Sequence, residues 1–129
     1  MNIRNPILLD KIRSQPLLDA IEGMPCTLRI SSFIPGHSCS SVSTVVPCHI
    51  RTPGTGISTK PSELACVAAC FNCHNILDLR DTRWKEISDK YPSAVLWRLV
   101  QALLETHARL QMAGIIEVKG AERVKGGAV

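Results

Sequence analysis

The feature that most constrains this chain is the run Cys70-Phe71-Asn72-Cys73-His74, where a histidine directly follows a pair of cysteines. A C-x-x-C turn presents two thiolates from one short loop, which is half of a tetrahedral zinc site. Two upstream cysteines lie at either end of a segment that turns at Pro35-Gly36 and would complete the site. The sequence therefore predicts a structural zinc ion with four cysteine ligands: Cys26, Cys39, Cys70 and Cys73.

Other interpretations of the cysteines stay open. The four thiols would be buried without a metal, or His37 would replace Cys39 as a ligand. Disulfides are less favoured, because charged residues interrupt the apolar positions of residues 1–23 and no signal peptide is visible. We therefore expect a cytoplasmic protein with reduced thiols. Cys48 and Cys66 lie in apolar runs, so we expect them to be buried outside the metal site.

Composition favours a small fold that needs such a metal. The chain has 129 residues and few aromatic side chains (two Trp, two Phe and one Tyr), so its core must consist mainly of aliphatic residues. Structural zinc contributes about 10–16 kcal/mol in small peptides, comparable to the stability of a whole domain. No apolar run approaches the roughly 20 residues needed to cross a bilayer, so we expect no membrane role.

The net charge of the chain is compatible with a nucleic-acid partner but does not indicate one. The formal net charge is +4 and is spread evenly along the chain. Four residues, Arg80, Arg83, Trp84 and Lys85, form a basic and aromatic patch that suits phosphates and a stacked base. A solvated helix face is the other interpretation of this patch.

The N-terminal half is expected to hold short elements. Residues 7–22 carry helical periodicity and favour one or two short helices broken near Pro16. Residues 27–34 favour extended structure, and residues 42–50 favour a strand that places His49 at its end. We expect residues 1–23 to be a helical extension of the main domain.

The C-terminal half is expected to be mostly helical. Residues 51–61 favour a long loop, residues 64–69 a second strand, and residues 72–79 a helix. The strongest helix covers residues 94–112, with Pro92 near its start and Gly114 past its end. Its predicted apolar stripe consists of Leu96, Val100, Leu103, His107 and Leu110, which makes His107 a core or interface residue. We expect a main domain over residues 24–114 and a tail over residues 115–129.

Three polar side chains carry the candidate chemistry. His49, at a strand end beside a glycine-rich loop, can take a proton from water near neutral pH, although a lone histidine is more often an ordinary surface residue. His74 and Asp78 stand four residues apart and should project from one helix face. Such a pair suits a hard divalent cation beside His49, with a surface ion pair as the other interpretation of Asp78.

In this order, the cysteines and histidines resemble the HNH, or ββα-metal, nucleases with a four-cysteine zinc site. The chain is more closely similar to the YbcO-like nucleases of lambdoid phages and prophages, relatives of the phage recombination-enhancement nuclease. The similarity spans about residues 24–114 and rests on these stretches: 26–30, 34–36, Cys39, 49–51, 54–56, 60–61, Leu64, and 69–74 with Asp78.

The resemblance implies an α+β fold, a small zinc-stapled, HNH-like finger with flanking helices that include a long C-terminal one. It implies a metal-dependent endonuclease that hydrolyses DNA during phage recombination or processing in the host cytoplasm. His49 would match the general base and His74 a ligand of the catalytic Mg²⁺ or Mn²⁺, to which Asp78 would add a ligand. Lys60, in the family's loop motif, would neutralise charge in the transition state.

Two positions depart from the family's pattern. Cys48 stands where many HNH enzymes place an Asp or His ligand, and a soft thiolate suits Mg²⁺ poorly. No Asn occupies the middle position between His49 and Cys70, where Glu63 is the nearest polar candidate. The alternative function is therefore a zinc module that binds DNA or a protein partner without cutting. A redox-sensing thiol protein is a weaker third interpretation, because the thioredoxin-like βαβ context is missing.

Overall fold

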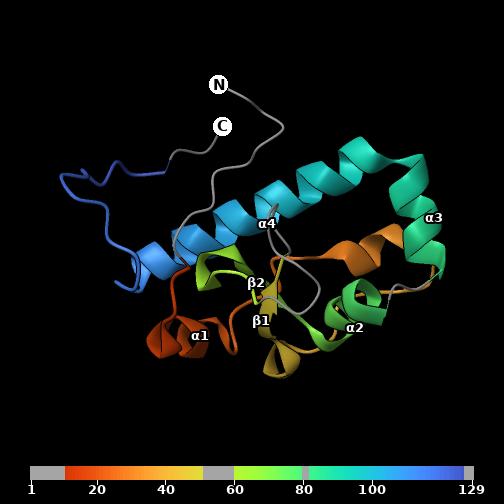
Figure 1. Ribbon diagram of the computed structural model, residues 1–129, viewed down its shortest axis with the longest axis horizontal. Coiled ribbons are helices and arrows are strands. Elements are labelled where there is room, and N and C mark those ends of the chain that lie inside the picture. Colours follow the sequence, from red (N-terminus) through yellow and green to blue (C-terminus); the bar gives the residue numbers. More distant parts are fainter. Residues whose placement is uncertain (1–10, 51–59, 80–81, 127–129) are drawn as a thin grey trace.

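The computed structural model describes residues 11–50, 60–79 and 82–126, and its centre is a two-stranded sheet followed by a helix. Strands β1 (Val46–His49) and β2 (Cys66–Ala69) pair antiparallel, and helix α2 (Phe71–Leu79) begins directly after Cys70 (Figure 1). The α+β class and the order strand, strand, helix agree with the sequence analysis. The loop predicted between the strands lies outside the described residues except for its last two positions.

Three further helices surround this centre: α1 (Gln15–Ile21), α3 (Thr82–Lys90) and α4 (Pro92–Met112). Figure 1 shows α4 running along one side of the sheet, with α1 and α2 on the other. Helix α4 contacts β2, α3 and α1, so it is the element that joins the parts. Short 3₁₀ turns occupy Ile30–Phe33, Val42–Thr44 and Glu63–Ala65. None of the described helices is both long and apolar enough for a membrane span.

Helix α1 begins at Gln15, one residue before the proline near which a break was predicted. The Ser14 side chain accepts a hydrogen bond from the Leu17 amide, and Pro16 lies in the first turn. Proline is tolerated there because the first helical amides have no acceptor within the helix. Leu17 and Ile21 stand one turn apart and are both buried. One short helix therefore lies where one or two helices broken near Pro16 were predicted; residues 11–14 are not helical, and residues 7–10 lie outside the described part.

The prediction of extended structure over residues 27–34 was wrong. Arg29 has a φ of 45°, in the left-handed region, and a 3₁₀ turn follows over Ile30–Phe33. The Ser31 amide in this turn donates to the Cys73 sulfur at 3.4 Å. The strand predicted over residues 42–50 shortens to β1, because its first residues form another 3₁₀ turn. Apolar and β-branched composition alone did not reveal these local turns.

The core is built on β2, all four residues of which are buried. Thr27 and Thr106 are also buried, and their hydroxyl oxygens lie 2.8 Å apart. The Thr27 hydroxyl donates to the Ala68 carbonyl of β2 at 3.2 Å, and the Thr106 hydroxyl donates to the Ala102 carbonyl at 2.7 Å. This polar chain satisfies buried groups while it joins β2 to α4.

Helix α4 is confirmed, but the predicted apolar stripe is turned by about one residue. The buried residues of the helix are Val95, Ala102, Thr106 and Leu110. Leu96 is 63% exposed, because one step along a helix turns a side chain by about 100°. His107 is half-buried, and its Nε2 lies 2.7 Å from the Leu64 carbonyl. Gly114, just past the helix, has a φ of 75° that favours glycine.

Helix α3 lies where the sequence analysis gave a helix face as one interpretation of the basic and aromatic patch, but without bounds for a helix. Trp84 is 7% exposed and packs edge-on against Phe33, with ring centroids 6.2 Å apart. Trp84 therefore belongs to the core and is not available to stack on a base. Arg80 lies outside the described residues.

Candidate metal centres

The four cysteines predicted to bind zinc do come together. The sulfur atoms of Cys26, Cys39, Cys70 and Cys73 all lie within 4.8 Å of one another. The Cys39 and Cys73 sulfurs are 3.8 Å apart, and a zinc tetrahedron with bonds of about 2.3 Å has edges of about 3.8 Å. All six cysteines of the chain are free of disulfides. The group, called the four-cysteine group below, can therefore bind a metal such as zinc.

Backbone amides surround the four-cysteine group. The Ser40 amide donates to the Cys70 sulfur at 3.3 Å, and the Cys70 amide donates to the Cys26 sulfur at 3.4 Å. Together with the Ser31 amide on Cys73, these donors stabilise negative charge on the sulfurs. Among the four, only Cys39 is exposed. Four identical soft donors with little access for water are typical of a structural site.

The acid strengths of these thiols differ in a way that suits metal binding. A hydrogen bond with Cys73 holds the pKa of Cys26 well below its usual range, and the same bond raises the pKa of Cys73. Burial raises the pKa of Cys39. Metal binding must release the protons that remain on these thiols.

A second group of donors lies between β1 and α2. The sulfur of Cys48, a ring nitrogen of His74 and a carboxylate oxygen of Asp78 lie within 4.8 Å of one another. The His74 Nε2 and an Asp78 carboxylate oxygen are 3.3 Å apart, which confirms that the two side chains share one helix face. Cys48 is 3% exposed, whereas the side chains of His74 and Asp78 are 33% and 57% exposed. This mixed group is therefore anchored in the core and open to solvent.

The sequence analysis expected Cys48 to be buried, which is confirmed, but missed its place beside His74. The signal was present: alternate residues of a strand face opposite sides, so one of Cys48 and His49 had to face the helix that follows β2. Burial and the nearby Asp78 raise the pKa of the Cys48 thiol to about 12. In the absence of a metal this thiol is protonated at neutral pH.

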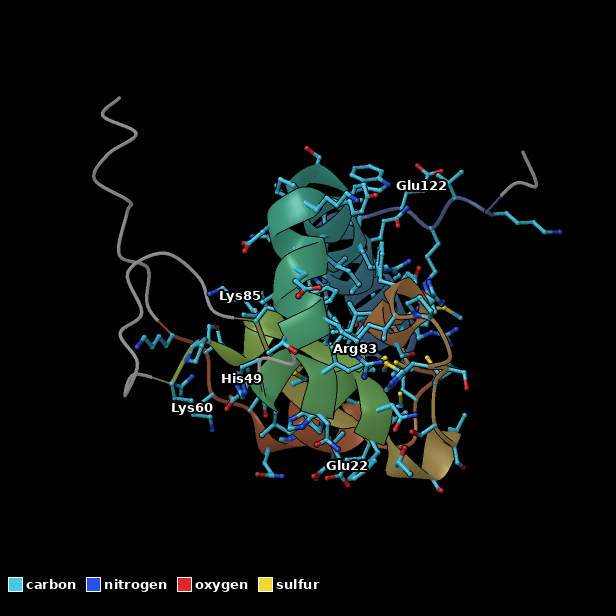
Figure 2. The ribbon with its side chains drawn as sticks, turned by 90° about the vertical axis from the view of Figure 1, so that its right-hand side faces the viewer. Glu22, His49, Lys60, Arg83, Lys85 and Glu122 are labelled. Carbon is cyan, nitrogen blue, oxygen red and sulfur yellow. The ribbon has the colours of Figure 1, made fainter. Side chains whose placement is uncertain are left out.

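His49 does not belong to the mixed group. Its side chain leaves β1 on the face opposite Cys48, together with Cys66, its partner in the sheet. The labels of His49 and Lys60 lie on the same side of the molecule in Figure 2. Burial and the positive charge of Lys60 lower the pKa of His49. Its Nε2 is buried without a hydrogen-bond partner in the described part of the chain. The imidazole is therefore neutral at pH 7, with a ring nitrogen not engaged by those residues.

Lys60 is held near His49 by residues that the sequence analysis did not single out for this role. Its ammonium lies 3.3 Å from the carboxylate of Glu63, which is buried and also accepts a hydrogen bond from the Ser14 amide. Arg13 donates to the carbonyl of Lys60 at 2.9 Å. Burial raises the pKa of Glu63, but the bonds from Ser14 and Lys60 outweigh it, so the net pKa is lowered. The Lys60–Glu63 pair is local (i,i+3), but Ser14 and Arg13 lie almost fifty residues earlier in the sequence, so no local spacing could have indicated them.

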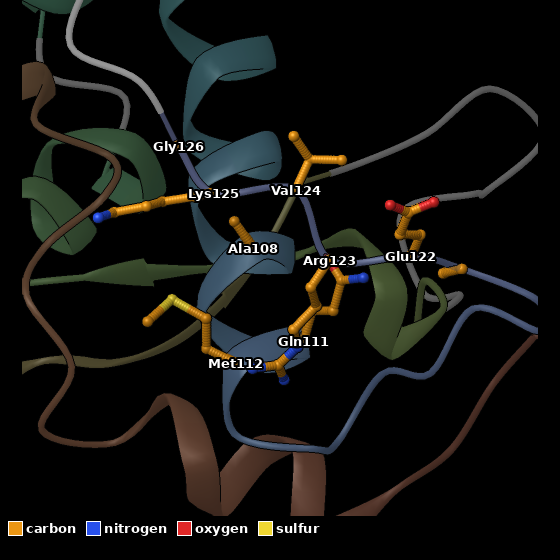
Figure 3. Close-up of a pocket in the computed structure, with 9 residues that line it drawn as sticks. Ala108, Gln111, Met112, Glu122, Arg123, Val124, Lys125 and Gly126 are labelled. Atoms are coloured by element: carbon orange, nitrogen blue, oxygen red, sulfur yellow. The ribbon is translucent and has the colours of Figure 1, made fainter.

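The remaining polar features lie elsewhere. His37 is exposed and its Nε2 lies 3.0 Å from the Arg83 guanidinium, while Cys39 occupies the ligand position that His37 was considered for. A surface hollow lies between the end of α4 and residues 121–126 (Figure 3). It contains no member of either donor group. Within residues 11–50, 60–79 and 82–126, the candidate chemistry therefore lies in the two donor groups and the neighbourhood of His49.

Comparisons of the chain with protein-family models, with curated proteins and with solved structures found no match. Two observations therefore come from the structure alone. The described residues form an α+β fold with a small antiparallel sheet, and they bring together a cysteine cluster that can hold a metal.

Proposed function

We propose that this protein is a metal-dependent DNA endonuclease with an HNH-like, ββα-metal finger held by structural zinc. The observation that carries the proposal is the arrangement at the end of β1. There a neutral histidine, His49, directly follows Cys48, which lies in a group of possible metal ligands. The sequence resemblance to nucleases of phages and prophages supplies the substrate class and a role in recombination or DNA processing.

Zinc in the four-cysteine group would fix the geometry of the neighbouring groups. Four thiolates at tetrahedral spacing suit this ion, and two of them come from the turn that starts α2. His74 follows directly after Cys73, so the orientation of that turn also sets the direction of the His74 side chain. The zinc would thus hold the mixed group in place without taking part in hydrolysis.

The side chains near the end of β1 suit phosphodiester hydrolysis. A divalent ion at the mixed group would polarise the scissile phosphate. The neutral His49 would accept a proton from the attacking water. The exposed ammonium of Lys60 would neutralise charge on the phosphate oxygens, and Glu63 would position that ammonium.

A second candidate function is a zinc module that binds DNA or a protein partner without cutting. Two observations favour it. Cys48 is a soft donor where HNH enzymes place a hard one, and the described geometry leaves His49 outside the mixed group.

A cleavage assay separates the two candidates. Purified protein is incubated with plasmid and with single-stranded DNA in Mg²⁺, Mn²⁺ or Zn²⁺, beside His49→Ala and the control His107→Ala. His107 is a half-buried histidine outside both donor groups. We expect the wild type and the control to cut DNA, and His49→Ala to cut roughly 100-fold more slowly or worse. Equal cleavage by His49→Ala, or none by the wild type, would overturn the nuclease proposal. DNA binding without cleavage would support the second candidate.

A further inference from the structure

We propose that Cys48, His74 and Asp78 form a second metal centre that selects a thiophilic divalent ion of the Zn²⁺ or Co²⁺ type over Mg²⁺. The sequence led us to expect only His74 and Asp78, and with them Mg²⁺ or Mn²⁺. The inference concerns metal binding alone, so it holds whether or not the protein cuts DNA.

The three donors are already close to the spacing that one ion requires. Their ligand atoms lie within 4.8 Å of one another, and the His74 and Asp78 atoms are 3.3 Å apart. Bonds of about 2.0–2.3 Å to zinc place tetrahedral ligands about 3.3–3.8 Å from each other. Small side-chain rotations therefore suffice for all three atoms to reach one ion.

The donors come from two elements whose relative position is fixed. Cys48 is buried on β1, which pairs with β2, and α2 follows β2 after a single residue. His74 and Asp78 lie one turn apart on α2 and already contact each other. A site on such a framework loses little conformational entropy on binding, in contrast to donors on a loose loop.

The donor set determines the class of ion. Mg²⁺ requires near-octahedral oxygen ligands and keeps much of its water, so a thiolate at one corner disfavours it. Sulfur, imidazole nitrogen and carboxylate oxygen are all zinc ligands, and three protein ligands plus one open position describe a catalytic type of zinc site. The exposure of His74 and Asp78 leaves room for that fourth position.

The second centre is distinct from the four-cysteine group. The two groups share no residue, and the four-cysteine group already has a complete tetrahedral set. His74 follows Cys73 in the chain, but one helical step turns the side chain by about 100°. The competing explanation is that His74 and Asp78 form only a surface ion pair, as such i,i+4 pairs often do.

A cobalt titration of the full-length zinc-loaded protein tests the inference in a large molar excess of Mg²⁺. We expect a second metal equivalent to bind with a thiolate-to-cobalt charge-transfer band, while the protein keeps its first equivalent of zinc. Cys48→Ala should lose this band and bind cobalt more than about 100-fold more weakly. Loss of a residue that only hydrogen-bonds to a metal ligand already weakens metal binding by about 10–100-fold, and loss of the ligand itself should cost more. The matched control, Cys66→Ala, removes a buried thiol of β2 outside the group and should retain the band.

A second variant guards against misfolding of Cys48→Ala. Asp78 is mostly exposed, so Asp78→Asn should keep the fold and the charge-transfer band while it weakens cobalt binding. Absence of a second cobalt equivalent in the wild type, or an unchanged titration in both Cys48→Ala and Asp78→Asn, would overturn the inference. Because no DNA is present, such a failure is separate from the outcome of the cleavage assay.

Discussion

The two donor groups use the same helix but differ in composition and in exposure. The four-cysteine group takes identical donors from three separate segments, and backbone amides surround its sulfurs. The mixed group takes three different donors from β1 and α2, of which His74 is partly exposed and Asp78 is exposed to solvent. Closed sites of one donor type are characteristic of structural zinc, whereas open sites keep a position for water or substrate.

This difference suggests that the start of α2 stabilises the fold, whereas the following positions carry the chemistry. Cys70, directly before the helix, and Cys73, in its first turn, connect it to distant parts of the chain. The residues of its next positions, His74 and Asp78, face solvent beside β1. A change in the first pair should therefore act on folding, and a change in the second on chemistry.

The largest effect is expected from Cys70→Ser. Loss of one thiolate should release the zinc and lower the free energy of unfolding by an amount comparable to the total, roughly 5 kcal/mol or more. Circular dichroism and metal analysis would measure both changes. Cys66→Ala, which removes a buried thiol outside both groups, should keep its zinc and its helices. A metal-free Cys70→Ser protein that is fully folded would contradict the structural role of the four-cysteine group.

His74→Ala should have the opposite profile. We expect DNA cleavage to fall by roughly 100-fold or more, because a candidate metal ligand is lost. The side chain is one-third exposed, so the free energy of unfolding should change by about 1 kcal/mol or less. Chemical denaturation and zinc analysis provide the comparison with Cys70→Ser. If His74→Ala also loses zinc and unfolds, the two groups are not separate.

Glu63→Gln should have a moderate effect on the surroundings of His49. The variant loses charge-assisted bonds to Ser14 and Lys60, so we expect about 1–3 kcal/mol less stability at neutral pH. The pKa of Glu63 is lowered by folding, so its contribution is present above the unfolded pKa of about 4.3 and is lost as the pH falls through the lower folded value. Urea unfolding at several pH values measures this difference, and an equal gap between variant and wild type at all pH values would contradict it.

The smallest effect concerns the pH dependence of cleavage. A general base must be unprotonated, and burial and Lys60 lower the pKa of His49. The acidic limb of kcat/KM should therefore lie below the value of about 6.5 for free histidine. Lys60→Gln removes the positive charge and should move that limb toward higher pH. A limb above 6.5 in the wild type would argue against His49 as the base.

Sequence reasoning succeeded where the signal was local. The C-x-x-C spacing, the i,i+4 relation of His74 and Asp78, and the long periodic helix α4 depend on neighbours in the chain. It also grouped Cys26 and Cys39 with the distant C-x-x-C pair, because the thiol itself marks a possible zinc ligand. It failed where the deciding partner was distant and had no such distinctive side chain. Arg29 adopts a left-handed conformation, and an amide two residues later bonds to Cys73, so the expected extended segment became a turn.

The mixed group shows the same contrast between local and distant signals within one site. His74 and Asp78 were predicted because they share a helix, whereas Cys48 joins them only through the pairing of β1 with β2. The positions of Lys60 and Glu63 depend on Ser14 and Arg13, almost fifty residues earlier. Pairing across such distances depends on tertiary packing, which a single sequence does not specify residue by residue.

The most direct test of two distinct centres on α2 is anomalous X-ray diffraction at the zinc absorption edge from crystals grown with zinc. We predict one peak about 2.3 Å from the sulfurs of all four cysteines of the four-cysteine group. A second peak should lie between Cys48, His74 and Asp78. A single peak at the four-cysteine group, with none beside Cys48, would contradict the account.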